Sequence, residues 1–330
     1  MRASTFIASL PSRATPIRLS AQLLPRFSCA DLASPVPGLA CLRHGVGGDI
    51  PLPLLGGPVF DLWQGQTPLR TGVSNGVRWA DDGSTVLLRL TVPDAEWAGD
   101  PAAASELAYR RLEAARQACG APHWWRLWNY LGGILSGSGD EERYRQFTLG
   151  RHRAWSAAGQ LDATLPAATA IGCAEGLHVF ALAGRIAAEP IENPRQVSAW
   201  RYPRDYGIQP PSFARASLLR EDDAGWLFVS GTASIVGHES RHVDDLAAQF
   251  AEARANLDAV LAAAAQRAGC AVSCFQPRNF KLYWSRAEDA VTHAALAQQL
   301  TAMAPTQVLH GTICRRELAV EIEALYALAP

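Results

Sequence analysis

The sequence predicts an α+β fold made of two tandem copies of one unit, each a mixed sheet with helices packed on one face. Two observations predict it. Segments with strand and helix patterns follow in the order strand, turn, strand, helix, strand, helix, and this order occurs twice along the 330 residues. Details recur as well: the acidic turn 81–83 has a counterpart at 222–225, and the aromatic stretch 124–128 has one at 280–284.

In the first unit the strands are rich in β-branched and aromatic residues around an Asp-Asp-Gly turn, and the first helix is alanine-rich and closed by Gly120. We expect strands at 73–79 and 84–92, a helix at 102–119, a strand at 124–131 and a helix at 140–158.

The second unit repeats these patterns, and its longest helix shows apolar residues at helical spacing from Leu246 to Val260. We expect strands at 177–185, 213–220 and 226–236, with the turn 221–225 between the last two, a helix at 244–268, a strand at 280–284, a helix at 289–303 and closing strands at 308–313 and 317–325.

This order of elements divides the chain into three regions. The length of the chain agrees with two domains of roughly 150 residues each. Residues 1–55 are rich in Pro, Leu, Ser and Arg without a sustained period, so we expect an irregular N-terminal arm lying over the first domain. The first domain is expected at 56–160, and the second, which carries most of the functional site, at 161–330.

Composition excludes several classes of protein. Thirty basic and 31 acidic residues give a net charge of -1, which argues against nucleic-acid or membrane binding driven by overall charge. No apolar run reaches the ~18 residues of a membrane-spanning helix. The seven cysteines are odd in number and form no C-x-x-C pair, so a disulfide framework is not expected. We expect a cytoplasmic protein.

One motif suggests zinc chemistry. His238, Glu239 and His242 form a literal H-E-x-x-H, which in zinc peptidases lies within a helix. Here it directly follows a predicted strand, and the next helix more plausibly begins near Asp244, a good N-cap residue. We interpret the motif as a polar loop between strand and helix, with a zinc peptidase as the minor alternative.

A second feature is the concentration of arginine, tyrosine and proline between residues 193 and 215. Guanidinium groups bind carboxylates with two parallel hydrogen bonds, and prolines restrict the loop that carries them. A solvated face and a single-stranded nucleic-acid site are the alternatives, but Lys281 is the only lysine of the chain. The segment favours a pocket for a small polyanion.

A third feature is the alternation near the C-terminus, which places Glu321 and Glu323 on one face of a strand. If that face lines a cleft, burial raises the pKa of a carboxyl and makes it a candidate general acid. Alternation does not choose between the two glutamates.

These segments resemble a known family. Residues 126–131, 142–147, 193–215 and 230–238 are similar to the corresponding motifs of the chorismatases, which convert chorismate to pyruvate and a hydroxylated benzoate or dihydrobenzoate. The ending 320–324 also resembles the RidA (YjgF) family. The resemblance implies two tandem RidA-like domains, and it explains the Gly-His-Glu-Ser stretch as a strand-to-helix corner.

The resemblance also implies roles for individual residues. Glu321 is the acid that protonates the enolpyruvyl methylene, and a mutation of Glu323 to Gln is expected to be much milder. Cys314 favours the benzoate-forming branches, and Ala233 lies in a motif where the branches differ. Substrate binding is assigned to Arg215, Tyr202, Arg151, Arg204, Tyr144 and Gln196.

The implied partner is chorismate, the implied product 3-hydroxybenzoate with 4-hydroxybenzoate as a second product of one branch, and the reaction requires no metal or other cofactor. The alternatives are hydrolysis of chorismate to a dihydroxycyclohexadiene carboxylate, RidA-like imine hydrolysis, and a non-enzymatic binding module. The sequence leaves open whether the protein is a monomer or a trimer.

Overall fold

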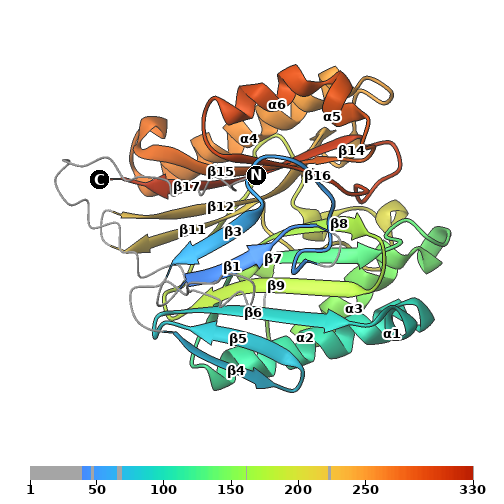
Figure 1. The fold of residues 1–330 in the computed structure, drawn as a ribbon, viewed down its shortest axis with the longest axis vertical. Helices are drawn as coiled ribbons and strands as arrows, with labels where there is room; N and C mark the ends of the chain where they lie inside the picture. Colours follow the sequence, from blue (N-terminus) through green and yellow to red (C-terminus); the bar gives the residue numbers. More distant parts are fainter. Residues whose placement is uncertain (1–38, 46–47, 65–68, 161, 222–223, 330) are drawn as a thin grey trace, which may run out of the picture.

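The computed structural model describes residues 39–45, 48–64, 69–160, 162–221 and 224–329. Two sheets lie face to face in the middle of the molecule, and helices cover the two outer faces, as Figure 1 shows with α2 and α3 on one side and α4 and α6 on the other. Within the described residues, none of the helices combines the length and apolar character that crossing a membrane requires. The predicted α+β class is confirmed.

The first sheet has six strands in the order β4-β5-β6-β9-β7-β8, and its only parallel pair is β7 with β8. Its strands are β4 Arg70–Ser74, β5 Val77–Asp81, β6 Thr85–Val92, β7 His123–Gly132, β8 Ala167–Cys173 and β9 Leu177–Gly184. Its helices are α1 Asp94–Gly99, α2 Pro101–Ala118 and α3 Arg143–Ala157, with 3-10 turns η2 Gly139–Glu141 and η3 Asp162–Thr164.

The second sheet has seven strands in the order β10-β11-β12-β17-β15-β16-β2. Its strands are β10 Glu189–Ile191, β11 Ala216–Glu221, β12 Ala224–Ala233, β15 Phe275–Trp284, β16 Thr306–His310, β17 Val320–Leu328 and β2 Leu54–Gly56. Its helices are α4 Leu246–Ala268, α5 Asp289–Thr292 and α6 Ala294–Thr301, with 3-10 turns η4 Ala199–Arg201, η5 Arg204–Tyr206 and η6 Val272–Cys274. Two short antiparallel pairs complete the fold: β1 Leu39–Arg43 with β3 Phe60–Gln64, and β13 Ile235–Val236 with β14 Glu239–Ser240.

The strand order confirms the predicted duplication. Position by position, β4-β5-β6-β9-β7-β8 corresponds to β10-β11-β12-β17-β15-β16, and β15 with β16 is again the parallel pair. The turn at 81–83 lies between β5 and β6, where Asp81 Oδ1 accepts the Gly83 N–H at 2.7 Å. Its predicted counterpart falls on Asp222 and Asp223, which lie outside the described residues.

The assignment of 177–185 to the second unit was wrong. This segment is β9, which lies in the first sheet between β6 and β7. β8, which was not predicted, also joins that sheet. The physical reason is that the β7-α3-β8 crossover produces a parallel pair, and the unit is completed only when an antiparallel strand returns beside β7. We therefore propose a domain boundary near residue 184 instead of 160.

The expectation of an irregular arm over residues 1–55 was wrong for its described part, while residues 1–38 lie outside the described residues. β1 pairs with β3, and β2 adds to the edge of the second sheet at β16. Leu42, Ile50 and Leu52 are buried in the core between the two sheets. The pairing partner of β1 lies about 20 residues further along the chain and that of β2 about 250 residues further, so neither strand leaves a local pattern in the sequence.

Candidate active site

A cavity of about 450 Å³ opens where the two units meet. Its walls come from the start of α3, the segment that precedes β11, the end of β12, the loop before β17, and β17 itself. Of the residues predicted from sequence, the structure brings the following into this cavity: Glu321, Cys314, Arg215, Tyr202, Tyr144 and Ala233. Ala233 lies opposite Glu321 in the pairing of β12 with β17.

Three predicted residues lie elsewhere. Arg151 is buried in the core of the first unit, where its guanidinium packs on the rings of Phe147 at 4.9 Å and Trp155 at 5.4 Å. The Arg204 side chain is 62 % exposed and forms two hydrogen bonds to the Asp140 carboxylate at 2.8 and 2.6 Å. Gln196 Nε2 donates to the Ile235 carbonyl at 2.9 Å.

Glu321 has the environment of a general acid. The residue is only 4 % exposed although it borders the cavity. Burial, reinforced by the negative charge of Glu323, raises the pKa of Glu321 to about 8, while Arg126 and Arg215 act in the opposite direction. The carboxyl is therefore protonated at neutral pH, and it borders the cavity.

Gly231 makes room for that carboxyl. An added Cβ at this position would lie 1.8 Å from Glu321 Oε1, so a larger residue is incompatible with the observed position of the carboxyl. The pairing of β12 with β17 shifts register between Val229 and Thr232. A bulge of this kind redirects side chains at the end of a strand, and here it accommodates the close approach of β17.

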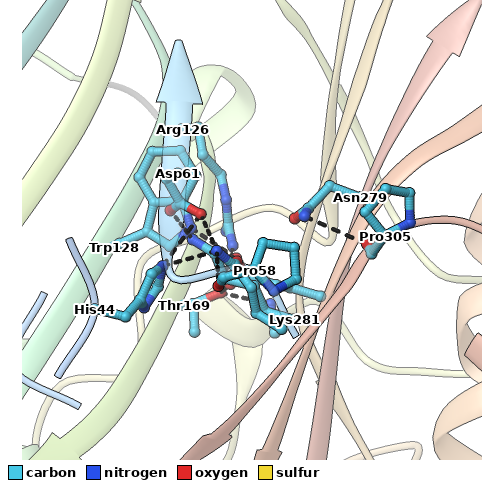
Figure 2. A network of polar contacts seen from close by, with 12 residues as sticks. His44, Pro58, Asp61, Arg126, Trp128, Thr169, Asn279, Lys281 and Pro305 are labelled. Carbon is cyan, nitrogen blue, oxygen red and sulfur yellow. Dashed lines mark hydrogen bonds and ion pairs between the residues drawn. The ribbon is translucent and has the colours of Figure 1, made fainter. Parts of the chain in front are cut away.

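Glu323, two residues further along the same strand, has the opposite environment. Figure 2 shows the surrounding network, which lies between the two sheets. Glu323 accepts hydrogen bonds from Arg126 Nη2 at 2.7 Å, Trp128 Nε1 at 2.8 Å and Thr169 Oγ1 at 2.8 Å. Although burial acts to raise it, the pKa of Glu323 is lowered by Arg126, Lys281 and these hydrogen bonds. Glu323 is not among the residues that line the cavity.

Arg215 and Tyr202 form one wall of the cavity. Arg215 Nη2 donates to the Tyr202 hydroxyl at 2.7 Å and to the Val197 carbonyl at 2.9 Å. The Arg215 guanidinium also packs on the Phe213 ring at 5.2 Å. One nitrogen is thus fixed by the protein, which orients a buried cation toward an anionic ligand in the cavity.

Cys314 borders the same space. Removal from water, reinforced by the charge of Glu321, raises the pKa of the Cys314 thiol to about 12, although Arg315 acts to lower it. The thiol is therefore neutral at physiological pH. It is suited to shape the cavity and to make weak hydrogen bonds, and it is not an activated nucleophile.

Sequence reasoning missed several residues of the cavity. Arg145 and Tyr206 lie within the segments that carried the family resemblance, and Arg315 and Arg316 directly follow Cys314. Arg315 packs on the Tyr206 ring at 4.1 Å and donates to the His238 carbonyl at 2.9 Å. Adjacency to a predicted site residue was the signal available in the sequence.

The H-E-x-x-H segment does not have the geometry of a zinc peptidase. Glu239 lies in β14 and not in a helix, and His242 Nε2 interacts with Glu252 Oε2 at 3.1 Å. His238 packs edge-on against Tyr206, with ring centroids 5.7 Å apart. Throughout the described residues, no group of three or more His, Cys, Asp or Glu side chains is arranged to hold a metal ion.

Comparison with known proteins identifies the family of the chain. Residues 61–183 match the family model "Chorismatase FkbO/Hyg5-like, N-terminal", and the match ends one residue before the end of β9. A chorismatase from Streptomyces rapamycinicus is 36 % identical over 278 residues, which cover 81 % of this chain and 82 % of that protein. A 3-hydroxybenzoate synthase from Streptomyces hygroscopicus is 34 % identical over 281 residues and 81 % of each chain.

Among solved structures, a chorismatase crystal structure superposes with a TM-score of 0.76 at 29 % identity, over 92 % of this chain and 97 % of that one. Sequence relatives and backbone similarity both extend over most of the chain, across the two units that build the cavity. The chain therefore belongs to the chorismatase family of enzymes.

Proposed function

We propose that this enzyme cleaves chorismate to pyruvate and 3-hydroxybenzoate, with Glu321 as the acid. The observation that carries the proposal is a buried carboxyl, protonated at neutral pH, in a cavity that also presents Arg215. The relative named 3-hydroxybenzoate synthase supports the product.

The first step is a proton transfer to carbon. Glu321 gives its proton to the methylene carbon of the enolpyruvyl group, which leaves positive charge on the ether oxygen and its carbon. Such a transfer requires a positioned acid shielded from water, and a pKa near the working pH provides both a proton and a useful driving force. The Glu321 carboxylate formed in this step lies close to the cation that it helps to stabilise.

The second step forms the ring product. The 4-hydroxyl oxygen attacks C3 of the ring, the C3–O bond to the enolpyruvyl group breaks, and pyruvate leaves with the bonding pair. The hydroxyl proton returns to Glu321, which restores the acid. The resulting arene oxide isomerises to 3-hydroxybenzoate, so the atoms of chorismate are divided between the two products and no water is consumed.

Cations of the cavity bind the two carboxylates of the substrate. Arg215, fixed by Tyr202 and Val197, lies close enough to Glu321 to influence its charge, so we assign it to the carboxylate of the reacting enolpyruvyl group. Tyr144, on the first turn of α3, forms the facing wall, and its pKa is raised well above the usual value by burial. A neutral phenol beside the ring excludes water without adding negative charge.

Two further expectations belong to this proposal. The enzyme is expected to act in the cytoplasm without metal or redox cofactor, because protonation of an enol ether requires neither. Since the two units already cover each other's inner sheet face within one chain, a monomer is favoured over a trimer, which light scattering after size exclusion would measure.

The decisive experiment is incubation of the purified protein with chorismate, with pyruvate measured through lactate dehydrogenase and ring products separated by chromatography. Pyruvate with 3-hydroxybenzoate in equal amounts is expected. Pyruvate with the dihydroxycyclohexadiene carboxylate would replace the product assignment by hydrolysis. Release no faster than the spontaneous reaction would exclude the activity, and tight binding without turnover would indicate a binding module. Hydrolysis of small imino acids instead would indicate RidA-like chemistry.

A further inference from the structure

Resting on the proposed role of Glu321, we propose that Glu323 is a positioning residue for catalysis: its permanent negative charge, which offsets the positive charges of Arg126 and Lys281, keeps the proton on Glu321. Glu323 does not border the cavity, so it acts through its neighbour and not on the substrate.

The first observation is how completely Glu323 is bound. Both carboxylate oxygens accept hydrogen bonds, Oε1 from Trp128 and Oε2 from Arg126 and Thr169, and Lys281 Nζ lies 3.5 Å from Oε1. Charged and neutral donors from β7, β8 and β15 thus converge on one buried group. A carboxylate held in this way is stabilised in its charged form, in agreement with the lowered pKa of Glu323.

The second observation is that the cations of this network are already matched by carboxylates. Lys281 Nζ also donates to Asp61 Oδ2 at 2.6 Å, and Asp61 accepts from Gln307 Nε2 at 2.7 Å and contacts His44 Nε2 at 3.2 Å. The pKa of Asp61 lies far below its usual range, and that of Lys281 above it. The positive charges of Arg126 and Lys281 are therefore balanced by the negative charges of Glu323 and Asp61, so this network adds no net positive charge beside Glu321.

The third observation is the arrangement of the two glutamates. They lie two residues apart on one face of β17, about 7 Å along the strand. The groups closest in effect to Glu321 are Glu323 from its own strand, Arg126 from β7, Arg215 from the segment before β11, Tyr144 from α3, and Cys314 from the preceding loop, and Tyr283 lies opposite it in the register of β15. The cavity that Glu321 borders is also lined by further charged residues of both signs: Arg145, Arg315, Arg316, Glu142, Asp205 and Glu317.

Apart from Glu323, these groups do not hold the proton on Glu321. Tyr144, Cys314 and Tyr283 have raised pKa values and are neutral, and the two arginines favour the ionised form of Glu321. Glu323 is thus the charged neighbour that opposes ionisation. Without its charge, Arg126 and Lys281 would carry uncompensated positive charge beside Glu321, and the acid would lose its proton at a lower pH.

The test is the pH dependence of kcat/KM for chorismate in the full-length enzyme and in Glu323→Gln. In the native enzyme we expect activity to fall above pH 8, as Glu321 ionises. In Glu323→Gln the midpoint of this fall should move about one to two pH units lower, as expected for one buried charge at this separation. Activity at pH 7 should drop and recover on acidification. An unchanged midpoint, with activity reduced equally at every pH, would show that Glu323 is only structural.

Asp61→Asn provides the second variant in case Glu323→Gln does not fold. This variant keeps the shape of the side chain but removes the negative charge of Asp61, which contacts Glu323 only through Lys281. The midpoint of the pH profile should therefore move in the same direction as in Glu323→Gln, by a smaller amount. A midpoint that stays in place or moves to higher pH overturns the proposal. Melting temperature and circular dichroism of each variant establish that a folded protein is compared.

A failure of this proposal is distinguishable from a failure of the proposed function. If the native enzyme releases no pyruvate, the proposed function fails, and the charge coupling is then measured by infrared spectroscopy. The band of a protonated carboxyl that is absent in Glu321→Gln identifies Glu321, and its loss should occur at lower pH in Glu323→Gln or Asp61→Asn than in the native protein. A native enzyme that is active, with variants whose titration is unchanged, contradicts the present inference alone.

Discussion

The central strands of the two units, β9 and β17, occupy the same place in their sheets but carry different residues on the inner face. β7 and β15 occupy corresponding places in the two strand orders, and Arg126 on β7 and Lys281 on β15 both lie close to Glu323. Opposite Arg126 lies Leu182, whereas opposite Lys281 lies Glu323. Two residues further along β7 and β15, Trp128 lies opposite Phe180, whereas Tyr283 lies opposite Glu321.

This contrast shows how one unit of a duplicated fold acquires catalytic groups. Phe180 and Leu182 extend the apolar core between the sheets, so the first unit supplies packing. The second unit carries two carboxyls, Glu321 and Glu323, on the corresponding strand β17, and Arg126 of the first unit binds Glu323. Catalytic groups thus arise at core positions of the repeat, where burial alone changes their ionisation.

The largest effect on activity is expected for Glu321→Gln, which removes the proton donor of β17. The amide keeps the shape but delivers no proton, so kcat should fall about 10²- to 10⁴-fold with KM nearly unchanged. The matched change in the first unit is Phe180→Leu, which should leave kcat within about threefold and lower the free energy of unfolding by about 1 kcal/mol. Steady-state kinetics and denaturant unfolding measure the two effects. Equal kinetic losses in both variants would mean that β17 has no special role.

Gly231→Ala tests the position of the acid and not its chemistry. The added Cβ forces the Glu321 carboxyl to move, and a displacement of about 1 Å is expected to lower kcat about 10²-fold. Gly99→Ala in the first unit is the control, because a Cβ at Gly99 meets no atom within 4 Å. Single-turnover rates with chorismate separate the chemical step from binding. A normal rate in Gly231→Ala would indicate that Glu321 need not occupy the observed position.

Arg215→Lys is expected to act on binding. Lysine keeps the charge but not the planar pair of donors, and one charge-assisted hydrogen bond contributes roughly 1.5–3 kcal/mol, so KM should rise about tenfold or more. Arg204→Lys, at an exposed arginine paired with Asp140, should change KM less than about twofold. Initial rates over a range of chorismate concentrations give both values, and an unchanged KM in Arg215→Lys would remove this residue from the site.

The smallest expected effect on rate is that of Cys314→Ala. Its thiol is neutral and borders the cavity, so alanine opens space for water without removing the acid. Pyruvate release should persist, while aromatic product falls and the dihydrodiol rises. Cys173→Ala is the counterpart in the first unit, at the end of β8, and should leave the products unchanged. Chromatography of the ring products tests this prediction. An unchanged ratio of aromatic product to dihydrodiol in Cys314→Ala would mean that Cys314 contributes only to packing.

Local patterns predicted the duplicated order, the long helix α4 and the shared face of Glu321 and Glu323. Residue alternation did not separate these glutamates, because their difference depends on partners from β7, β8 and β15. Glu323→Gln is still expected to be milder than Glu321→Gln, but its effect on activity is now expected to depend on pH. Arg151 and Arg204 were expected to hold substrate carboxylates, and only the packing of α3 and the pair with Asp140 show where their side chains lie.

The short strand β2 has a consequence for how the chain folds during synthesis. β2 completes the edge of the second sheet by pairing with β16, and Asp61 of the neighbouring β3 matches the charge of Lys281. These residues leave the ribosome about 220 to 250 residues before their partners. Contacts of such long range are slow to form, so β2 and Asp61 acquire their partners only after β15 and β16 have been translated. The segment 54–61 therefore makes completion of the second sheet depend on residues more than 200 positions apart.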